Sequence, residues 1–288
     1  MRNLLTFPLL LCLLLLACKS KPRVPAAPPV PKVLAPSRAY QKLPFPATEK
    51  LTYELRLTRL PLSINAGTIV FESVGISAQP VVDKLEFKPS PEDRVLHLRA
   101  VITAKGLVLR LFGLSVNDRF ETLVDAKNFR MRAVLREIDE GKKHNLQTGL
   151  FDYEKNEASY RTLDMNNLAA GAREKVVKLE PDMQDLLSAF YLLRVQEAKE
   201  GVTYKFPLVY EGERKDFDLL VQGREEVETD LGKFNTVKIQ AGLFGEGRLS
   251  TREGEFFIWV TDDAAHTPVK LQAKTSGATI TASLSKRE

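Results

Sequence analysis

The sequence predicts a mainly β protein: a strongly curved antiparallel sheet, in the form of a barrel or a sandwich, with one amphipathic helix packed on it. Short runs in which apolar and polar residues alternate recur from residue 51 to residue 284, a period typical of strands with one wet face. Brief turn sequences separate many runs, which favours antiparallel neighbours. A single segment, 182–194, has the spacing of a strong helix.

The first residues have the build of an export signal. A positive start at Arg2 precedes an apolar stretch from Leu4 to Leu16 that only Thr6 interrupts. As a helix this stretch would rise about 20 Å, less than the roughly 30 Å of a hydrocarbon core, so a lasting transmembrane anchor is disfavoured. We therefore expect residues 1–17 to be a signal peptide that is removed.

The residues Leu15, Leu16, Ala17 and Cys18 end this stretch and resemble the lipobox of bacterial lipoproteins. The resemblance implies that Cys18 receives diacylglycerol and further acyl chains such as palmitate, and becomes the first residue of the mature chain. The other of the two cysteines lies inside the signal, so no downstream cysteine could pair with Cys18. An ordinary secretory signal with an incidental cysteine is therefore the less favoured alternative. Several acyl chains would anchor the protein to a membrane without a protein span.

The residues after Cys18 indicate how the anchor is used. Lys19 stands where an aspartate marks inner-membrane retention in enteric-type bacteria, so by analogy we expect a cell-envelope protein anchored in the outer membrane, on its periplasmic face. Prolines recur through residues 18–46, at Pro22, Pro25, Pro28, Pro29, Pro31, Pro36, Pro44 and Pro46. Such a run predicts an extended tether that takes no part in a helix or a sheet ladder. The tether serves either to reach a target or as a plain spacer.

Residues 47–288 are expected to form a single β-rich domain, since all-β domains of about 240 residues often stand as one unit. The formal net charge is +5, and the Lys and Arg residues are scattered rather than clustered, which argues against nucleic acid as a partner. Both cysteines lie outside this domain, so it has no disulfide. No motif indicates a cofactor.

The strands are expected in two sets. The first set comprises 52–59, 67–74, 96–102, 116–123, 129–138, 143–153 and 158–163, with turns at 65–67, 125–128 and 140–141 and a polar loop at 88–93. The stretch 166–174 breaks the pattern and is the expected midpoint of the fold. The second set comprises 202–210, 215–222, 224–228, 233–241, 248–251, 255–261, 269–274 and 278–284, with turns at 229–232 and 261–264.

Two segments depart from simple alternation. The run Gly106–Gly113 is apolar on both faces except for Arg110, which predicts a fully buried strand, with an exposed hydrophobic lip as the alternative. The segment 182–194 predicts a helix capped by Asp182. Its apolar stripe comprises Met183, Leu186, Leu187, Phe190 and Leu193. We expect this stripe to pack on the concave face of the sheet, as core or as a lid.

Several short motifs resemble a bacterial envelope family that is known only as a domain of unknown function. They are 117–121, 151–153, 187–194, 229–236 and 258–263, followed by Pro268 and Val269, and the likeness spans most of residues 51–284. The resemblance implies an exported, largely antiparallel β protein without an established activity. By analogy only, its curved sheet is similar to the half-barrels of lipoprotein carriers and lipid-binding envelope proteins.

No catalytic constellation stands out. The best candidate for a hydrolase or a metal site is Asp262 and Asp263 with His266, although aspartates after a strand more often form turns. Ser188 lies on the predicted helix without a nucleophile elbow around it. The glycine-rich stretch 242–247 lies between strands, so we expect a hairpin or a bulge rather than a phosphate loop. The sequence therefore predicts neither an enzyme nor a metal site.

The expected function is a non-enzymatic binding or assembly factor for an apolar or amphipathic envelope ligand such as a lipid. The candidate ligand-binding residues are Leu107, Leu109, Leu111, Phe112, Phe190 and Trp259, although core is the favoured role of Trp259. The alternative is a structural or interaction lipoprotein that docks on an envelope protein complex or the cell wall. In both cases the lipid anchor holds the protein at the membrane.

Overall fold

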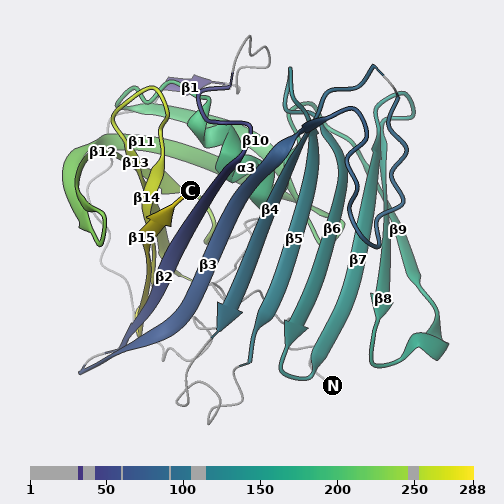
Figure 1. Ribbon diagram of the computed structural model, residues 1–288, viewed down its shortest axis with the longest axis horizontal. Coiled ribbons are helices and arrows are strands. Elements are labelled where there is room, and N and C mark those ends of the chain that lie inside the picture. The colour runs from purple at the N-terminus through teal and green to yellow at the C-terminus, as the bar shows by residue number, and fades with distance from the viewer. Residues whose placement is uncertain (1–31, 35–42, 60, 91, 105–114, 246–252) are drawn as a thin grey trace.

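The computed structural model describes residues 32–34, 43–59, 61–90, 92–104, 115–245 and 253–288 (Figure 1). Cys18, most of the predicted tether, the run Gly106–Gly113 and the predicted strand 248–251 lie outside these residues. Among the described residues, no helix is both long enough and apolar enough to cross a membrane.

One sheet holds all fifteen described strands. The first wall of the sheet is a meander of β2 (Glu49–Arg59), β3 (Leu62–Ser77), β4 (Val95–Ala104), β5 (Asn117–Asp125), β6 (Met131–Glu140), β7 (Lys143–Asp152), β8 (Glu157–Asp164) and β9 (Arg173–Lys178). A 3-10 turn, η2 (Leu168–Ala170), precedes β9. The second wall is a meander of β10 (Val202–Tyr210), β11 (Glu213–Thr229), β12 (Gly232–Ala241), β13 (Glu255–Thr261), β14 (Pro268–Lys274) and β15 (Thr279–Arg287). The last strand, β15, pairs antiparallel with β2 and so joins the two walls.

The sheet curls so that the second wall folds back behind the first, with the helix α3 (Leu186–Arg194) between them (Figure 1). The described strands β9 and β10 do not pair with each other, so the curl stays open at that seam. The predicted fold class, a strongly curved antiparallel sheet with one helix packed on it, is confirmed. Fourteen strands, β2 to β15, form antiparallel pairs with their neighbours, as the short turns predict.

Three details of the strand prediction are wrong. The expected turn at 65–67 lies inside β3, where the pairing with β2 shifts at a bulge. Gly67 has a φ of 139°, and a Cβ there would lie 2.0 Å from the carbonyl oxygen of Thr103, so only glycine fits. The expected strands 215–222 and 224–228 are one strand, β11, with a bulge between Val221 and Gly223. Strand β9 was not predicted.

The helix is shorter than predicted and buried on every side. It begins at Leu186 and its cap is Asp185, while Asp182 has a φ of 62° in the preceding turn. Asp185 Oδ1 accepts a hydrogen bond from the Ser188 amide at 2.7 Å, and Ser188 Oγ accepts one from the Asp185 amide at 3.0 Å. Residues 187–194 are all buried, because the sheet surrounds the helix rather than meeting one stripe of it.

The last residue of α3 is held by a buried ion pair. Arg194 is 1% exposed and Glu49 of β2 is 4% exposed, and their closest nitrogen and oxygen lie 2.5 Å apart. Arg194 Nε also donates to the carbonyl of Ala265 at 3.2 Å. Arg287 of β15 lies 3.0 Å from the other Glu49 oxygen. These contacts tie the helix to both walls of the sheet.

Part of the predicted tether belongs to the folded body. Strand β1 (Lys32–Leu34) pairs in parallel with β10, with Lys32 opposite Val202. Phe45 is buried, and its ring centre lies 5.3 Å from that of Tyr191. The expectation that residues 18–46 join no sheet ladder is therefore wrong for this stretch. The prolines of the tether lie outside β1, so its three residues keep their N–H groups for pairing.

The loop between β3 and β4 covers the outer face of the first wall. Val82 of this loop packs with Leu123 and Leu135 in a second, smaller apolar cluster. Nearby, Glu121 forms hydrogen bonds with His97 and, at 2.9 Å, with Arg99. Burial alone would raise the pKa of Glu121, but these hydrogen bonds lower it below its ordinary value. The outer face is thus held by this apolar cluster together with a paired charge network.

The buried ion pair makes a prediction about stability. We expect Glu49→Gln to lower the free energy of unfolding by about 3 kcal/mol or more, because it leaves the guanidinium of Arg194 buried without its charge partner. The matched control is Glu226→Gln, which removes an exposed pair with Lys233 and should cost less than about 1 kcal/mol. Urea unfolding of both variants measures the difference, and equal losses would contradict the structural role of Glu49.

Candidate functional site

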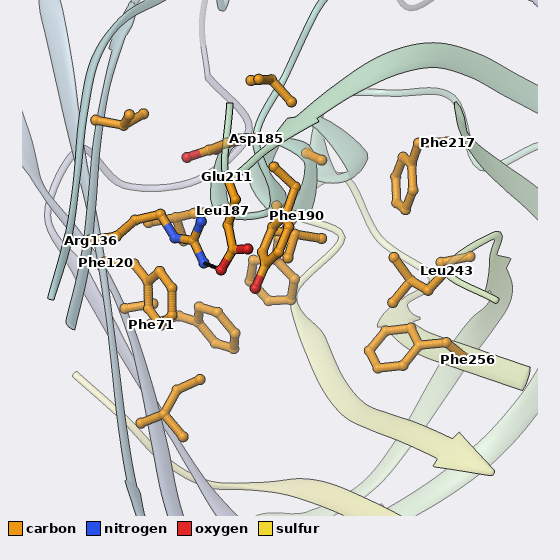
Figure 2. Close-up of a pocket in the computed structure, with 18 of the residues that line it drawn as sticks. Phe71, Phe120, Arg136, Asp185, Leu187, Phe190, Glu211, Phe217, Leu243 and Phe256 are labelled. Carbon is orange, nitrogen blue, oxygen red and sulfur yellow. Dashed lines mark ion pairs between the residues drawn. The ribbon is translucent and has the colours of Figure 1, made fainter. Parts of the chain in front are cut away.

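A cavity of about 160 Å³ lies between α3 and the concave face of the sheet (Figure 2). Its apolar lining comprises Ile69, Phe71, Ala100, Ile102, Phe120, Val134, Leu186, Leu187, Ala189, Phe190, Val209, Phe217, Leu219, Ala241, Leu243, Phe256, Ile258 and Leu271. Its polar lining comprises Arg136, Gln147, Tyr160, Asp185, Tyr210 and Glu211. Both walls contribute, so residues distant in sequence meet here.

Side-chain alternation explains how the sheet builds this lining. Successive residues of a strand point to opposite faces, so Val134 and Arg136 of β6 share the inner face. Phe71 of β3 stacks on Phe190 of the helix, with ring centres 4.1 Å apart. In Figure 2, Phe71 and Phe120 lie on one side of Phe190, and Phe217, Leu243 and Phe256 lie on the other.

Arg136 provides the positive charge of the lining. It is 9% exposed, and one of its terminal nitrogens lies 3.3 Å from Gln147 Oε1. The other terminal nitrogen of Arg136 lies 3.8 Å from Oε1 of Glu211, a residue in the turn between β10 and β11 (Figure 2). Its Cζ is 4.3 Å from the ring centre of Tyr210 and 5.6 Å from that of Phe120. Burial opposes the charged form, but the proximity of Tyr210 and Glu211 raises the pKa of Arg136 above its ordinary value.

Asp185 and Asp118 are acidic groups on the inner side of the sheet. Burial raises the pKa of Asp185, although hydrogen bonds from Thr122 Oγ1, at 2.6 Å, and from the Ser188 amide oppose the rise. Both of its oxygens are therefore used in holding the start of α3 to β5. Burial raises the pKa of Asp118 to about 6, although the Asp139 amide donates to it at 2.9 Å. Asp118 does not line the cavity.

The predicted ligand-binding residues have different positions. Phe190 lines the cavity, whereas Leu107, Leu109, Leu111 and Phe112 lie outside the described residues. The prediction that Trp259 lines a cavity is wrong for this site, because Ile258 and Phe256 take the inward positions of β13. The indole N–H of Trp259 donates to the Glu225 carboxylate on the outer face. Nζ of Lys270 lies 4.8 Å from its ring centre, and Trp259 is 3% exposed, so the favoured core role describes it better.

The candidate catalytic residues do not converge. Asp262 pairs with Arg224 at 2.7 Å. Asp263 Oδ1 accepts hydrogen bonds from Thr261 Oγ1 at 2.7 Å and from the Ala265 amide at 3.0 Å, which is the turn-forming role of an aspartate. His266 Nδ1 lies 3.1 Å from the carbonyl oxygen of Arg194. Within the described ranges, no group of three His, Cys, Asp or Glu side chains could hold a metal ion.

Sequence reasoning missed Arg136 and Glu211. A signal for Arg136 was available, because it occupies the same face of its strand as the buried Val134 and Ile138. A charged residue at an inward position of a strand points to a buried polar site. Glu211 gave no such signal, since it lies in a turn whose approach to β6 depends on the curl of the whole sheet.

Comparisons with known proteins bear on the fold and the family. No curated protein matches this sequence. A β-barrel-like protein of the domain of unknown function DUF1849 from Brucella abortus is similar in structure, with a TM-score of 0.50 and 13% identity over 88% of this chain and 99% of that one. This likeness concerns the fold alone.

Two further solved structures are more distant. A predicted exported protein with a YmcC-like fold from Bacteroides fragilis has a TM-score of 0.35 and 8% identity, over 88% of this chain and all of that one. A predicted lipoprotein from Parabacteroides distasonis has a TM-score of 0.34 and 10% identity, over 85% of this chain and 98% of that one.

The family resemblance seen in the sequence is confirmed by a family model. The model of DUF3108, described as a protein of unknown function, matches residues 65–285. That span runs from the bulge of β3 into β15 and includes the cavity and its helix. The chain therefore belongs to the DUF3108 family.

Proposed function

We propose that this protein is a non-enzymatic binding or assembly factor, anchored through Cys18 on the periplasmic face of the outer membrane, that takes the apolar part of an envelope ligand into the cavity beside α3. The observation that carries the proposal is the cavity itself: eighteen of its lining residues are apolar, and its few polar groups include one buried arginine. Sites for small amphipathic molecules are commonly built in this way.

The size of the cavity limits the ligand. An apolar cavity of roughly 150 Å³ accommodates a molecule the size of benzene. The cavity of about 160 Å³ therefore suits a ring or a short hydrocarbon segment, and a long acyl chain would enter only by its end. Its two acids, Asp185 and Glu211, already have structural partners, which is why we propose binding rather than chemistry.

The cost of the cavity also supports a binding role. Lining atoms that face empty space lack the packing contacts of a filled core, so a cavity costs the fold stability. A ligand that fills the space restores the missing contacts and stabilises the folded state by mass action.

Two alanine-to-leucine substitutions, one inside the cavity and one outside it, test whether the space is available to a ligand. Ala241→Leu fills part of the cavity, so it should change the free energy of unfolding by less than about 1 kcal/mol while co-purified apolar ligand falls severalfold. The control, Ala273→Leu, lies on β14 at a residue that is 1% exposed and does not line the cavity. It should cost about 1 to 3 kcal/mol through overpacking and leave ligand content per folded molecule unchanged.

Urea unfolding and mass spectrometry of extracted small molecules measure these effects. Equal stability losses in the two variants would contradict an open cavity. Crosslinking in intact cells tests the docking alternative: a stoichiometric protein partner, with no small molecule extracted from the purified protein, would favour a structural role over ligand binding.

The anchor has its own test. We expect globomycin, which blocks the lipoprotein signal peptidase, to cause accumulation of the unprocessed precursor. The mature chain should begin at Cys18 with a mass that includes its acyl chains, and Cys18→Ala should release the protein from the outer-membrane fraction. A mature chain that begins elsewhere, or that is free in the periplasm, would rule out the lipid anchor.

A further inference from the structure

We infer that Arg136 binds the head group of the ligand, and that this group carries a single negative charge, as a carboxylate does. This inference rests on the proposed function and adds the chemical class of the ligand: a short amphiphile with one acidic end. The apolar part would lie against Phe71 and Phe190, and the acidic group would lie at the inner face of β6, where Arg136 lines the same cavity.

The first support is that Arg136 has few close partners for a buried guanidinium. A guanidinium has five N–H donors. Among the described residues, its neutral partners are Gln147 Oε1, at 3.3 Å, and the Tyr210 side chain, while the Glu211 carboxylate stays at 3.8 Å. The rings of Tyr210 and Phe120 add cation–π contacts. A ligand carboxylate at hydrogen-bond distance would therefore add charge-assisted hydrogen bonds, which are stronger than those to neutral groups.

The second support is that Glu211 can be displaced. Its side chain is 34% exposed and lies in the turn between β10 and β11. Its Oε1 lies 3.8 Å from Lys143 Nζ as well as 3.8 Å from Arg136. When a ligand carboxylate takes its place beside Arg136, Glu211 keeps a cationic neighbour in Lys143. The exchange therefore leaves no acid without a counter-charge.

The charge of the ligand follows from the other acids of the lining. Asp185 and Glu211 both line the cavity, so a doubly charged group such as a phosphate monoester would meet more repulsion than a carboxylate. Asp185 does not compete for Arg136 as Glu211 does, because its oxygens accept from Thr122 and Ser188. A planar carboxylate also matches the fork of a guanidinium.

The test compares octanoate with 1-octanol, which share an apolar chain and differ in the acidic group. The protein is the chain from Lys19 to Glu288 produced without acylation, which retains every described residue. Isothermal titration calorimetry should give octanoate an affinity about tenfold or more above that of 1-octanol. Arg136→Gln should abolish this preference and leave 1-octanol binding unchanged.

Glu211→Gln should change the affinity for octanoate in the direction opposite to Arg136→Gln. It removes the acid that competes for Arg136, so octanoate should bind severalfold more tightly while 1-octanol is unaffected. The control, Glu226→Gln, lies near the far end of β11, outside the cavity lining, and removes an exposed pair with Lys233, so it should change neither affinity. Loss of 1-octanol binding by Arg136→Gln would show that this variant does not fold. In that case Glu211→Gln alone tests the role of Arg136.

The outcomes separate the two proposals. Octanoate that binds no more tightly than 1-octanol, or that gains nothing from Glu211→Gln, overturns the role of Arg136 and leaves the apolar cavity standing. Failure of both molecules to bind overturns the cavity as a ligand site and the inference with it.

Discussion

The buried ends of α3 impose the constraint on which the rest of the structure depends. A helix leaves amide groups unpaired at its start and carbonyl groups unpaired at its end, and inside a curled sheet little water is at hand to satisfy them. The chain answers at the start with Asp185, which caps the helix and accepts from Thr122 of β5. At the end, Gln196 Nε2 donates to the Leu192 carbonyl at 3.3 Å, and His266 Nδ1 lies 3.1 Å from the carbonyl oxygen of Arg194. The Arg194 side chain pairs with Glu49 of β2. These polar contacts fix both ends of the helix relative to the sheet.

The position of the helix determines which part of the curled sheet it fills and which seam is left for other contacts to cover. Its rings fill the space beside β2 and β3, where Phe190 stacks on Phe71. The seam between β9 and β10 is covered by other means. Gln184 forms an isolated parallel bridge with Leu208 of β10, and β1 pairs with the same strand. Glu213 lies 3.5 Å from Lys175 of β9, so the β10–β11 hairpin is held against the far edge by charge. An open edge covered in this way is protected from pairing with other chains.

The sequence predicted much of the fold because most strands have one buried face. It failed where that condition fails. Strand β9 is exposed at nearly every residue, so no alternation marks it. In β13, Phe256, Phe257, Ile258 and Trp259 are all buried, so the period of two could not tell which of them face the cavity. The cavity was beyond sequence reasoning, because it lies between walls whose distance depends on the curl and on the helix. Only Arg136, a charged residue on the same face of its strand as the buried Val134 and Ile138, could have indicated it.

The two costly features of the inner face occur together, and this coincidence has a physical meaning. The cavity costs stability because lining atoms lack neighbours, and the burial of the Arg136 guanidinium costs desolvation that its partners have to offset. An apolar residue at position 136 with larger side chains around it would remove both costs, in a domain without a disulfide to offset them. A fold tolerates such departures from good packing mainly at functional sites. One molecule with an apolar body and an acidic end would supply both missing sets of contacts at once, whereas core packing alone accounts for neither.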